Sequence, residues 1–346
     1  MSAPLVVIDA DVLGRQRTGD ETYVENLLAR LPALAGDDLR LAALTRRPEL
    51  VPPAIEAVHV PARLQEARMV HAVPRALRRL GAALAHFQHA LPLSCTCPAI
   101  VTVHDLSFER DPSVMGIRHR AIFRVVVPYA VKRAARVLTV SERTKDDLVE
   151  LYGLDPRRIV VTPHGVDPSF SPGERDGDSY LLFVGAVQRR KNPMAAAEAA
   201  SELGMKLVVV GPSRDSTLVH ALQRQGADVR GYVSKDELVE LYRGAAALVL
   251  PSRYEGFGLP CLEAMASGVP VIAADAGALP ETCGDAALLV APGDAGGFTD
   301  ALRSGVSEPD VRDRLVAAGL RRAAHLTWDA TAARTDRAIS DLLAPG

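Results

Sequence analysis

Short β-rich apolar runs alternate with longer amphipathic segments along this sequence, and no other feature restricts its fold as strongly. Such alternation is typical of parallel β-sheets whose strands are connected and covered by helices. The chain has 346 residues, whereas single hydrophobic cores stop growing at roughly 250–300 residues. We therefore expect two domains, each with its own parallel sheet.

The predicted strands fall into two groups, separated by a stretch at 163–179 that is rich in Pro, Gly, Ser and Asp. The predicted strands are 5–10, 39–44, 99–105 and 136–141 in the first group, and 180–186, 206–212, 228–233, 246–252 and 270–277 in the second. Clear helical patterns cover 21–34, 116–134 and 142–152. The expected fold class is α/β, with two Rossmann-like, doubly wound parallel-sheet domains. Such domains bind ligands outside the carboxyl ends of their strands, so we expect them to face a central cleft.

The composition excludes several functional classes. The 40 basic residues nearly balance the 42 acidic ones, which argues against nucleic-acid binding. No apolar run approaches the roughly 20 residues that span a bilayer, and the N-terminus lacks the basic flank of a signal peptide. The four cysteines form neither a zinc-binding spacing nor a C-x-x-C pair. These features predict a cytoplasmic enzyme with reduced thiols.

One segment of the first half, residues 63–79, is unusually basic. It carries five arginines and a single acid, interleaved with Leu, Met, Val and Ala. A basic amphipathic helix of this kind can lie on an anionic membrane surface. The alternative is a solvated helix face that is broken at Pro74. Both readings stay open, and the first predicts a peripheral contact with the inner face of the membrane.

The stretch SRYEGFGLPCLEAMASGVPVIAADAG, at 252–277, predicts a strand-to-helix corner at the carboxyl edge of the second sheet. Pro260 suits the first helical turn and Gly268 suits the end of the helix. Glycines in the corner let backbone amides approach a ligand, and the helix start adds unpaired N–H groups and partial positive charge. Glu255 lies in the corner itself, and Glu263 lies about one turn inside the helix.

Two carboxylates beside an anion-friendly helix start suit a ligand that has both phosphates and many hydroxyls. Carboxylates accept hydrogen bonds from sugar hydroxyls, while amides and arginines bind phosphates. The corner therefore predicts a nucleotide-sugar site. The alternative is a purely structural corner, in which Glu263 only complements the helix dipole, a contribution of about 0.3–1 kcal/mol.

Residues that could bind the same ligand follow other predicted strands. In the second half, Gly185 ends a strand and is followed by Arg189, Arg190 and Lys191, which suit a diphosphate. A solvated basic loop is the alternative for this segment. In the first half, His104 ends a strand where a cleft is expected.

Two features at or after the first predicted strand could bind a phosphate or a metal ion. Gly19 forms a turn before a helix, a geometry that suits a phosphate. Asp9-Ala10-Asp11 spells D-x-D, a sequence that binds metal ions in some enzymes. Because it ends the first strand of a doubly wound domain, we expect no metal there.

Taken in order, these motifs resemble glycosyltransferase family 4, the retaining nucleotide-sugar glycosyltransferases of the GT-B fold. The resemblance covers nearly the whole chain. Its motifs are T-G-x-E-x-Y at 18–23, HDL at 104–106, ARVLTVSERTKDDL at 135–148, VVTPHGVD at 160–167, VGAVQRRKN at 184–192, VVGP at 209–212, GYVSKDEL at 231–238 and E-x7-E at 255–263. It implies an acceptor-side domain at 1–170, a donor domain at 171–326, and a C-terminal helix at 327–346 that crosses back to the first domain.

The resemblance also implies a role for each matching residue. Glu255 would face the transferred sugar, Glu263 would bind the ribose, and His104 would lie near the reactive face of the sugar or its 6-hydroxyl. The implied catalytic residues are Glu255, His104, Arg190 and Lys191; the implied donor-binding residues are Gly19, Arg189, Arg190, Lys191, Gly231, Tyr232, Val233, Glu255, Gly256, Phe257, Gly258, Leu259 and Glu263. Residues 231–233 would border the base.

The sequence departs from the family pattern at two positions. Ala186 stands where many relatives carry an arginine after the strand glycine, and Arg189 or Arg190 is expected to compensate. Glu21 stands where many relatives have a second glycine, which narrows the freedom of the backbone to approach the acceptor.

The expected activity is transfer of a hexose from a nucleoside diphosphate sugar, with GDP-mannose first and UDP-glucose or another UDP-hexose next, in a role such as polysaccharide biosynthesis. The expected acceptor is a glycan, a lipid-linked molecule or a small molecule. No cofactor and no metal are expected. The rival interpretations are a nucleotide-sugar epimerase and a non-catalytic nucleotide-sugar-binding protein of the same fold.

Overall fold

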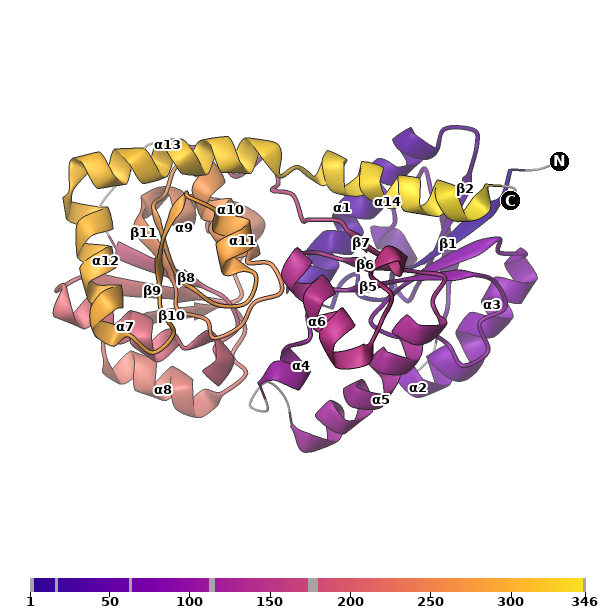
Figure 1. Cartoon of the computed structure of the whole chain (residues 1–346), viewed down its shortest axis with the longest axis horizontal. Coiled ribbons are helices and arrows are strands. Elements are labelled where there is room, and N and C mark those ends of the chain that lie inside the picture. The colour runs from indigo at the N-terminus through magenta and orange to yellow at the C-terminus, as the bar shows by residue number, and fades with distance from the viewer. Residues whose placement is uncertain (1–2, 16–17, 62–63, 112–115, 174–179, 345–346) are drawn as a thin grey trace. The chain divides into compact units, whose positions relative to one another are not determined.

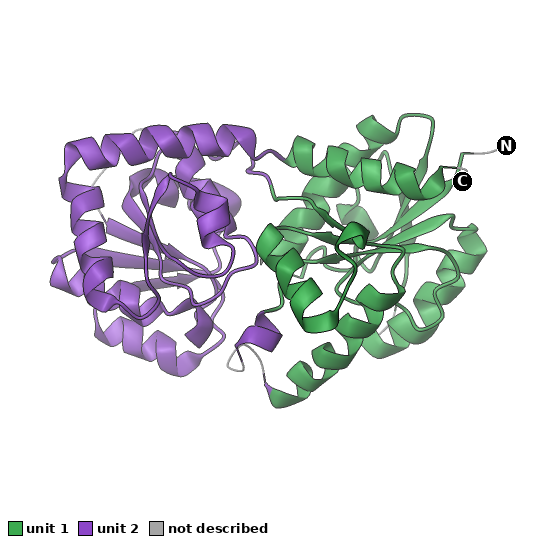
Figure 2. Cartoon of the chain, in the orientation of Figure 1, with its two compact units in different colours: residues 1–106, 117–164, 328–346 green, residues 107–116, 165–327 purple. Residues whose placement is uncertain are grey.

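The computed structural model describes residues 3–15, 18–61, 64–111, 116–173 and 180–344. The chain divides into two compact units (Figure 2). The first unit consists of 1–106, 117–164 and 328–346, and the second consists of 107–116 and 165–327. The chain therefore leaves the first unit and returns to it for its last helix.

The first unit is built on a seven-stranded parallel sheet with the order β3-β2-β1-β4-β5-β6-β7. Figure 1 labels β1, β2, β5, β6 and β7 of this sheet. The strands are β1 (Leu5–Asp9), β2 (Arg40–Thr45), β3 (Glu56–His59), β4 (Leu84–Gln88), β5 (Ala99–Val103), β6 (Arg136–Thr139) and β7 (Ile159–Val161). β3, β4 and β7 were not among the predicted strands. β1 lies between β2 and β4, so the strand order reverses direction beside β1.

Helices connect these strands, and one further helix follows from the end of the chain. They are α1 (Thr18–Ala35), α2 (Gln65–Ala67), a π-helical turn (Arg68–Ala72), α3 (Val73–Leu80), α5 (Ile117–Arg133), α6 (Glu142–Tyr152) and α14 (Trp328–Leu343). Ser141 caps α6 by accepting a 3.1 Å hydrogen bond from the backbone N of Thr144. Pro74 does not break a helix, because it occupies the first turn of α3.

The second unit has a six-stranded parallel sheet with the order β10-β9-β8-β11-β12-β13. Its strands are β8 (Tyr180–Val184), β9 (Lys206–Val210), β10 (Asp228–Gly231), β11 (Ala245–Leu250), β12 (Val271–Ala274) and β13 (Ala287–Val290). Its helices are α4 (Ser107–Arg110), a 3₁₀ turn (Arg189–Lys191), α7 (Pro193–Glu202), α8 (Ser216–Arg224), α9 (Lys235–Gly244), α10 (Leu259–Ala266), α11 (Leu279–Cys283), α12 (Ala295–Ser307) and α13 (Pro309–His325). The strand order reverses between β8 and β11.

The central strands of both sheets are buried on both faces. Every residue of β5 and β11 is buried, as expected for parallel strands that helices cover on each side. These findings confirm the predicted class of two doubly wound α/β domains. Among the described helices, none is long and apolar enough to cross a membrane.

Candidate functional site

The loops after β8 and β11 flank the point where the second sheet reverses its strand order. Crevices at such switch points are where open α/β sheets bind ligands. Gly185 follows β8, and the predicted corner follows β11. The two loops are joined by a 2.8 Å hydrogen bond from the backbone N of Arg253 to the carbonyl oxygen of Arg190.

An ion-pair cluster forms between these loops. Lys191 Nζ lies 2.5 Å from Glu255 Oε1, and Arg190 Nη1 lies 3.4 Å from Glu255 Oε2. Arg190 also donates a hydrogen bond to the carbonyl oxygen of Tyr254. Glu255 and Arg190 are buried, with exposed fractions of 6% and 7%. Burial alone would raise the pKa of Glu255, but the charges of Lys191 and Arg190 hold that pKa below its usual range.

Arg189 lies apart from this cluster. Its side chain is 71% exposed, and its Nε lies 3.7 Å from Asp215 Oδ2, at the start of α8. Arg190 and Lys191 are therefore the two cations of the predicted basic loop that meet Glu255.

Two glycines fix the backbone of the corner. Gly258 has a φ of +103° and caps α10. Gly277, with a φ of +58°, lies so close to Glu255 that a Cβ atom there would be 2.6 Å from both the N and the O of Glu255. Ala278 N also donates a 2.9 Å hydrogen bond to Glu255 O. The segment after β12 therefore holds Glu255 in place, a contact that sequence reasoning missed.

Glu263 lies on α10 with a different partner. Its Oε2 accepts a 2.7 Å hydrogen bond from the hydroxyl of Tyr242, which is fully buried on α9. Burial raises the pKa of Glu263 to about 7, and the hydrogen bond from Tyr242 opposes that rise. Nothing in the spacing of the sequence connects Tyr242 to Glu263, so this partner was also missed.

The other predicted donor-binding residues of the second unit lie at or just after the ends of β10 and β11. Gly256 and Phe257 are buried in the corner, and Leu259 begins α10. Gly231 ends β10 with a φ of +73°, and Tyr232, next along the chain, is 56% exposed. Val233 precedes α9, whose cap is Ser234.

In the first unit, His104 follows β5 and lies beside Asp20, near the start of α1. His104 Nε2 is 2.9 Å from Gln88 Oε1 and 3.9 Å from Asp20 Oδ1. Burial lowers the pKa of His104 to about 4, although the charge of Asp20 opposes the shift, so the imidazole is neutral at pH 7. Gly19 lies in the first turn of α1, with no described atom within 4 Å of a Cβ built there.

His89, His104 and Asp20 are the described residues whose spacing could hold a metal ion. One ligand atom from each lies within 4.8 Å of the others. His89 follows β4 with a φ of +56°, a left-handed conformation that is uncommon outside glycine. Two imidazoles and a carboxylate suit a divalent transition metal.

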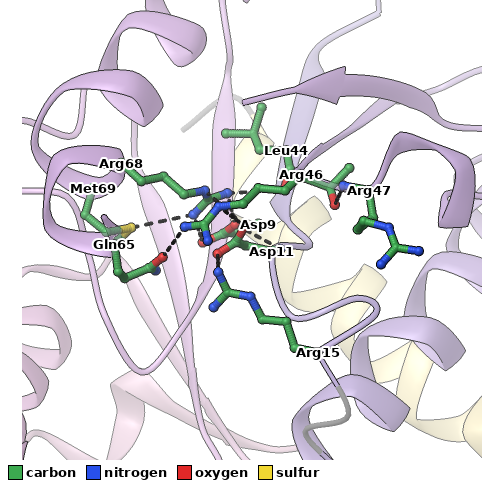
Figure 3. Close-up of polar contacts among 10 residues, drawn as sticks. Asp9, Asp11, Arg15, Leu44, Arg46, Arg47, Gln65, Arg68 and Met69 are labelled. Carbon is green, nitrogen blue, oxygen red and sulfur yellow. Dashed lines mark hydrogen bonds and ion pairs between the residues drawn. The ribbon is translucent and has the colours of Figure 1, made fainter. Parts of the chain in front are cut away.

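The D-x-D acids contact arginines (Figure 3). Arg68 is fully buried, with its Nη2 2.5 Å from Asp9 Oδ1 and its Nη1 3.1 Å from Asp9 Oδ2. Asp11 Oδ2 lies 2.8 Å from Arg15 Nη2, and its Oδ1 lies 3.3 Å from Arg46 Nε. Burial raises the pKa of Asp11, against the charge of Arg68. Both carboxylates thus have guanidinium partners, and Arg68 of the basic stretch 63–79 points into the protein.

Two family models match the chain in succession. "Glycosyltransferase Family 4" matches residues 17–170, and "Glycosyl transferases group 1" matches residues 168–322. Together the two matches extend across both units.

Curated relatives match part of this sequence. A D-inositol 3-phosphate glycosyltransferase from Frankia alni is 35% identical over 61% of this chain and 60% of its own length. The O-antigen chain mannosyltransferase B of Escherichia coli is 29% identical over 67% of each chain. The chain thus spans about 60% of the first relative.

Solved structures resemble the whole chain in fold. A sucrose-phosphate synthase from Thermosynechococcus elongatus superposes with a TM-score of 0.80 at 20% identity, over 98% of this chain and 99% of that one. HepE from Anabaena, solved in complex with UDP and glucose, has a TM-score of 0.76 at 14% identity, over 98% and 100%.

Proposed function

Because the chain belongs to glycosyltransferase family 4 and has the GT-B fold, we propose that it transfers a hexose from a nucleoside diphosphate sugar to an acceptor hydroxyl with retention of configuration. The observation that carries this proposal is the cluster of Arg190, Lys191 and Glu255 at the switch point of the second sheet. It offers two cations and a carboxylate where a ligand is expected.

The two cations would serve the leaving group. A donor diphosphate competes with Glu255 for Arg190 and Lys191, and these cations stabilise the negative charge that develops as the nucleoside diphosphate departs. Glu255 then accepts hydrogen bonds from the hydroxyls of the transferred sugar. The amides of Gly256 to Leu259, at the start of α10, line the sugar pocket.

Glu263 would accept hydrogen bonds from the ribose hydroxyls, with Tyr242 fixing the orientation of the carboxylate. In the first unit, Gly19 would leave room for a phosphate of the donor. Neutral His104 can exchange a hydrogen bond with a sugar hydroxyl, because its imidazole carries one donor and one acceptor nitrogen. Residues 231–233 would border the base.

In the reaction, the acceptor oxygen forms a bond to the anomeric carbon while the bond from that carbon to the phosphate oxygen breaks. The acceptor proton passes to the departing phosphate on the same face of the sugar, which retains the configuration. A double displacement would also retain it. The two routes differ in whether the sugar is first bonded to the protein.

GDP-mannose is the donor that we propose first. The name of the O-antigen mannosyltransferase relative supports a mannosyl donor. A UDP-hexose is the alternative, supported by the UDP and glucose in the HepE structure. The acceptor would be a glycan, a lipid-linked molecule or a small molecule such as a phosphorylated inositol, the acceptor named for the Frankia relative. We propose a cytoplasmic location and no metal requirement.

A binding panel tests this function. Calorimetry and thermal unfolding would be measured with GDP, UDP, ADP and their hexose conjugates, each with and without EDTA. A ligand that binds the folded chain raises its stability by about 2.7 kcal/mol at one hundred times the dissociation constant. We expect one nucleotide to stabilise the chain equally in both conditions. No response to any nucleotide would overturn the proposal, and a response that EDTA abolishes would overturn its metal-free form.

A further inference from the structure

The first half of α5 presents large apolar side chains to solvent. Ile117 is 86% exposed, Ile122 is 52% exposed and Val125 is 69% exposed. Burying one such side chain is favourable by about 1.5–3 kcal/mol. Contiguous exposed apolar surface on a globular protein marks an interaction site.

The second half of α5 is packed against the protein, whereas its first half is exposed to solvent. Val127, Ala130 and Val131 are buried, so that part of α5 packs onto the first unit. Arg118, Ile122 and Val125 are spaced by four and three positions, which places them on one face of the helix. The exposed face therefore combines apolar side chains with a cation.

The charges of α5 all have the same sign. The helix carries no Asp or Glu between Ile117 and Arg133. Its basic residues are Arg118, Arg120, Arg124, Lys132 and Arg133. A surface with this composition is complementary to a negatively charged partner.

A neighbouring loop adds to this surface. Leu93 is 65% exposed, and its carbonyl oxygen accepts a 3.1 Å hydrogen bond from the hydroxyl of Tyr129 on α5. We define the α5 surface as Leu93, Ile117, Arg118, Ile122 and Val125.

We propose that the α5 surface docks onto an anionic lipid bilayer. A helix with exposed apolar side chains and a basic polar face lies in the membrane interface, with the apolar groups among the acyl chains and the cations among the headgroups. A second copy of the chain fits less well, because like charges would meet across a two-fold contact.

The basic stretch 63–79 fits a bilayer less well than α5. Val73 and Leu77 are buried, and Arg68 is held by Asp9 inside the first unit. Leu64, 66% exposed, and Val70, 39% exposed, are its exposed large apolar residues. The predicted membrane contact of this stretch is therefore kept as a separate arm of the test.

The test is flotation of the full chain with vesicles, in the absence of any donor, so that it does not depend on the proposed transfer. Vesicles of phosphatidylglycerol and phosphatidylcholine would be compared with vesicles of phosphatidylcholine alone, at low and high salt. We expect binding to the anionic vesicles that weakens with salt. Arg118→Gln should lower the partition coefficient about fivefold. Ile122→Ser with Val125→Ser should lower it about tenfold or more.

Two matched controls carry the same chemical change elsewhere. Leu34→Ser alters a 44% exposed residue on α1, and Leu64→Ser alters the exposed residue of the stretch 63–79. Both should keep wild-type binding, and all variants should keep the wild-type melting temperature. The proposal is overturned if the wild type does not float with anionic vesicles, or if the α5 variants float as well as the wild type. It is also overturned if Leu64→Ser alone abolishes flotation, or if the α5 variants instead dissociate a dimer in sedimentation.

Discussion

The hydroxyl of Tyr242 donates a 2.7 Å hydrogen bond to Oε2 of Glu263 and so connects α9 to α10 within the second unit. Burial brings the pKa of this glutamate to about 7, where its ionisation is half complete at physiological pH. Perturbed carboxyl groups of this kind concentrate at functional sites. The carboxylate that we assign to the ribose therefore titrates near neutral pH.

Donor binding should depend on pH through Glu263. The ionised carboxylate is the stronger acceptor for ribose hydroxyls, so the KM for the donor should rise as the pH falls below about 7. Glu263→Gln should raise the KM at pH 8 and flatten the profile, with a smaller effect on kcat. The hydrogen bond from Tyr242 lowers the pKa of Glu263. Tyr242→Phe removes this bond and should therefore move the inflection to higher pH. Identical KM profiles for the wild type and Glu263→Gln would contradict the assignment.

The same group should influence stability with a definite sign. Because the pKa of Glu263 is raised from 4.5 to about 7 in the folded chain, its contribution to stability is fully present below pH 4.5 and is lost as the pH rises through 7. Glu263→Gln should therefore be more stable than the wild type at pH 8, by about 1–3 kcal/mol, and nearly equal to it at pH 4.5. Urea unfolding of both proteins at the two pH values measures this, and an equal difference at both would refute it.

Removing the charge of Glu255 should cost both turnover and stability. Glu255→Gln leaves Lys191 and Arg190 without their carboxylate, and breaking a buried pair costs about 3–5 kcal/mol. Loss of a group that acts at the reacting centre lowers kcat by about 10²–10³-fold. Arg303→Gln is the control, because its exposed pair with Asp300 contributes about 0–1 kcal/mol. If both variants behaved alike in steady-state kinetics and urea unfolding, the cluster would have no special role.

The contact between Gly277 and Glu255 should be sensitive to a single methyl group. Gly277→Ala places a Cβ 2.6 Å from the backbone of Glu255, so the corner must move and activity should fall. Gly204→Ala is the matched control, because Gly204 has a similar φ of +63° and no described atom lies within 4 Å of a Cβ built there. It should show only the left-handed backbone cost of about 1–2 kcal/mol. Thermal unfolding and kcat of the two variants give the comparison, and equal losses would exclude a specific contact.

Most of the fold could be predicted because apolar periodicity reports burial. The helix predicted at 142–152 matches α6, and the strand predicted at 180–186 matches β8 apart from its last two residues. β4 was missed because its sequence, LAHFQ, contains a buried histidine. Nε2 of His86 lies 2.7 Å from the hydroxyl of Thr102 on β5, and no pattern in the sequence reveals such a partner.

The candidate site could be predicted only as far as strand ends reveal it. Parallel topology places the loops with Arg190 and Glu255 at one edge of the sheet, and the structure brings these side chains together. Tyr242 and Gly277 reach the glutamates through tertiary packing, for which residue type and spacing give no signal. Arg68 was counted with a basic stretch, but its charge is used inside the protein.

The last helix has a consequence for how the protein is made. Trp328 and Ile339 of α14 are buried in the first unit, and Asp329 pairs with Arg30 of α1 at 2.7 Å. The surface of α1 that receives this helix is completed by residues translated some three hundred positions later. All of the second unit is therefore translated before the residues that complete the core of the first unit. Chains that stop short of α14 expose apolar surface on α1, and this would mark them for quality control.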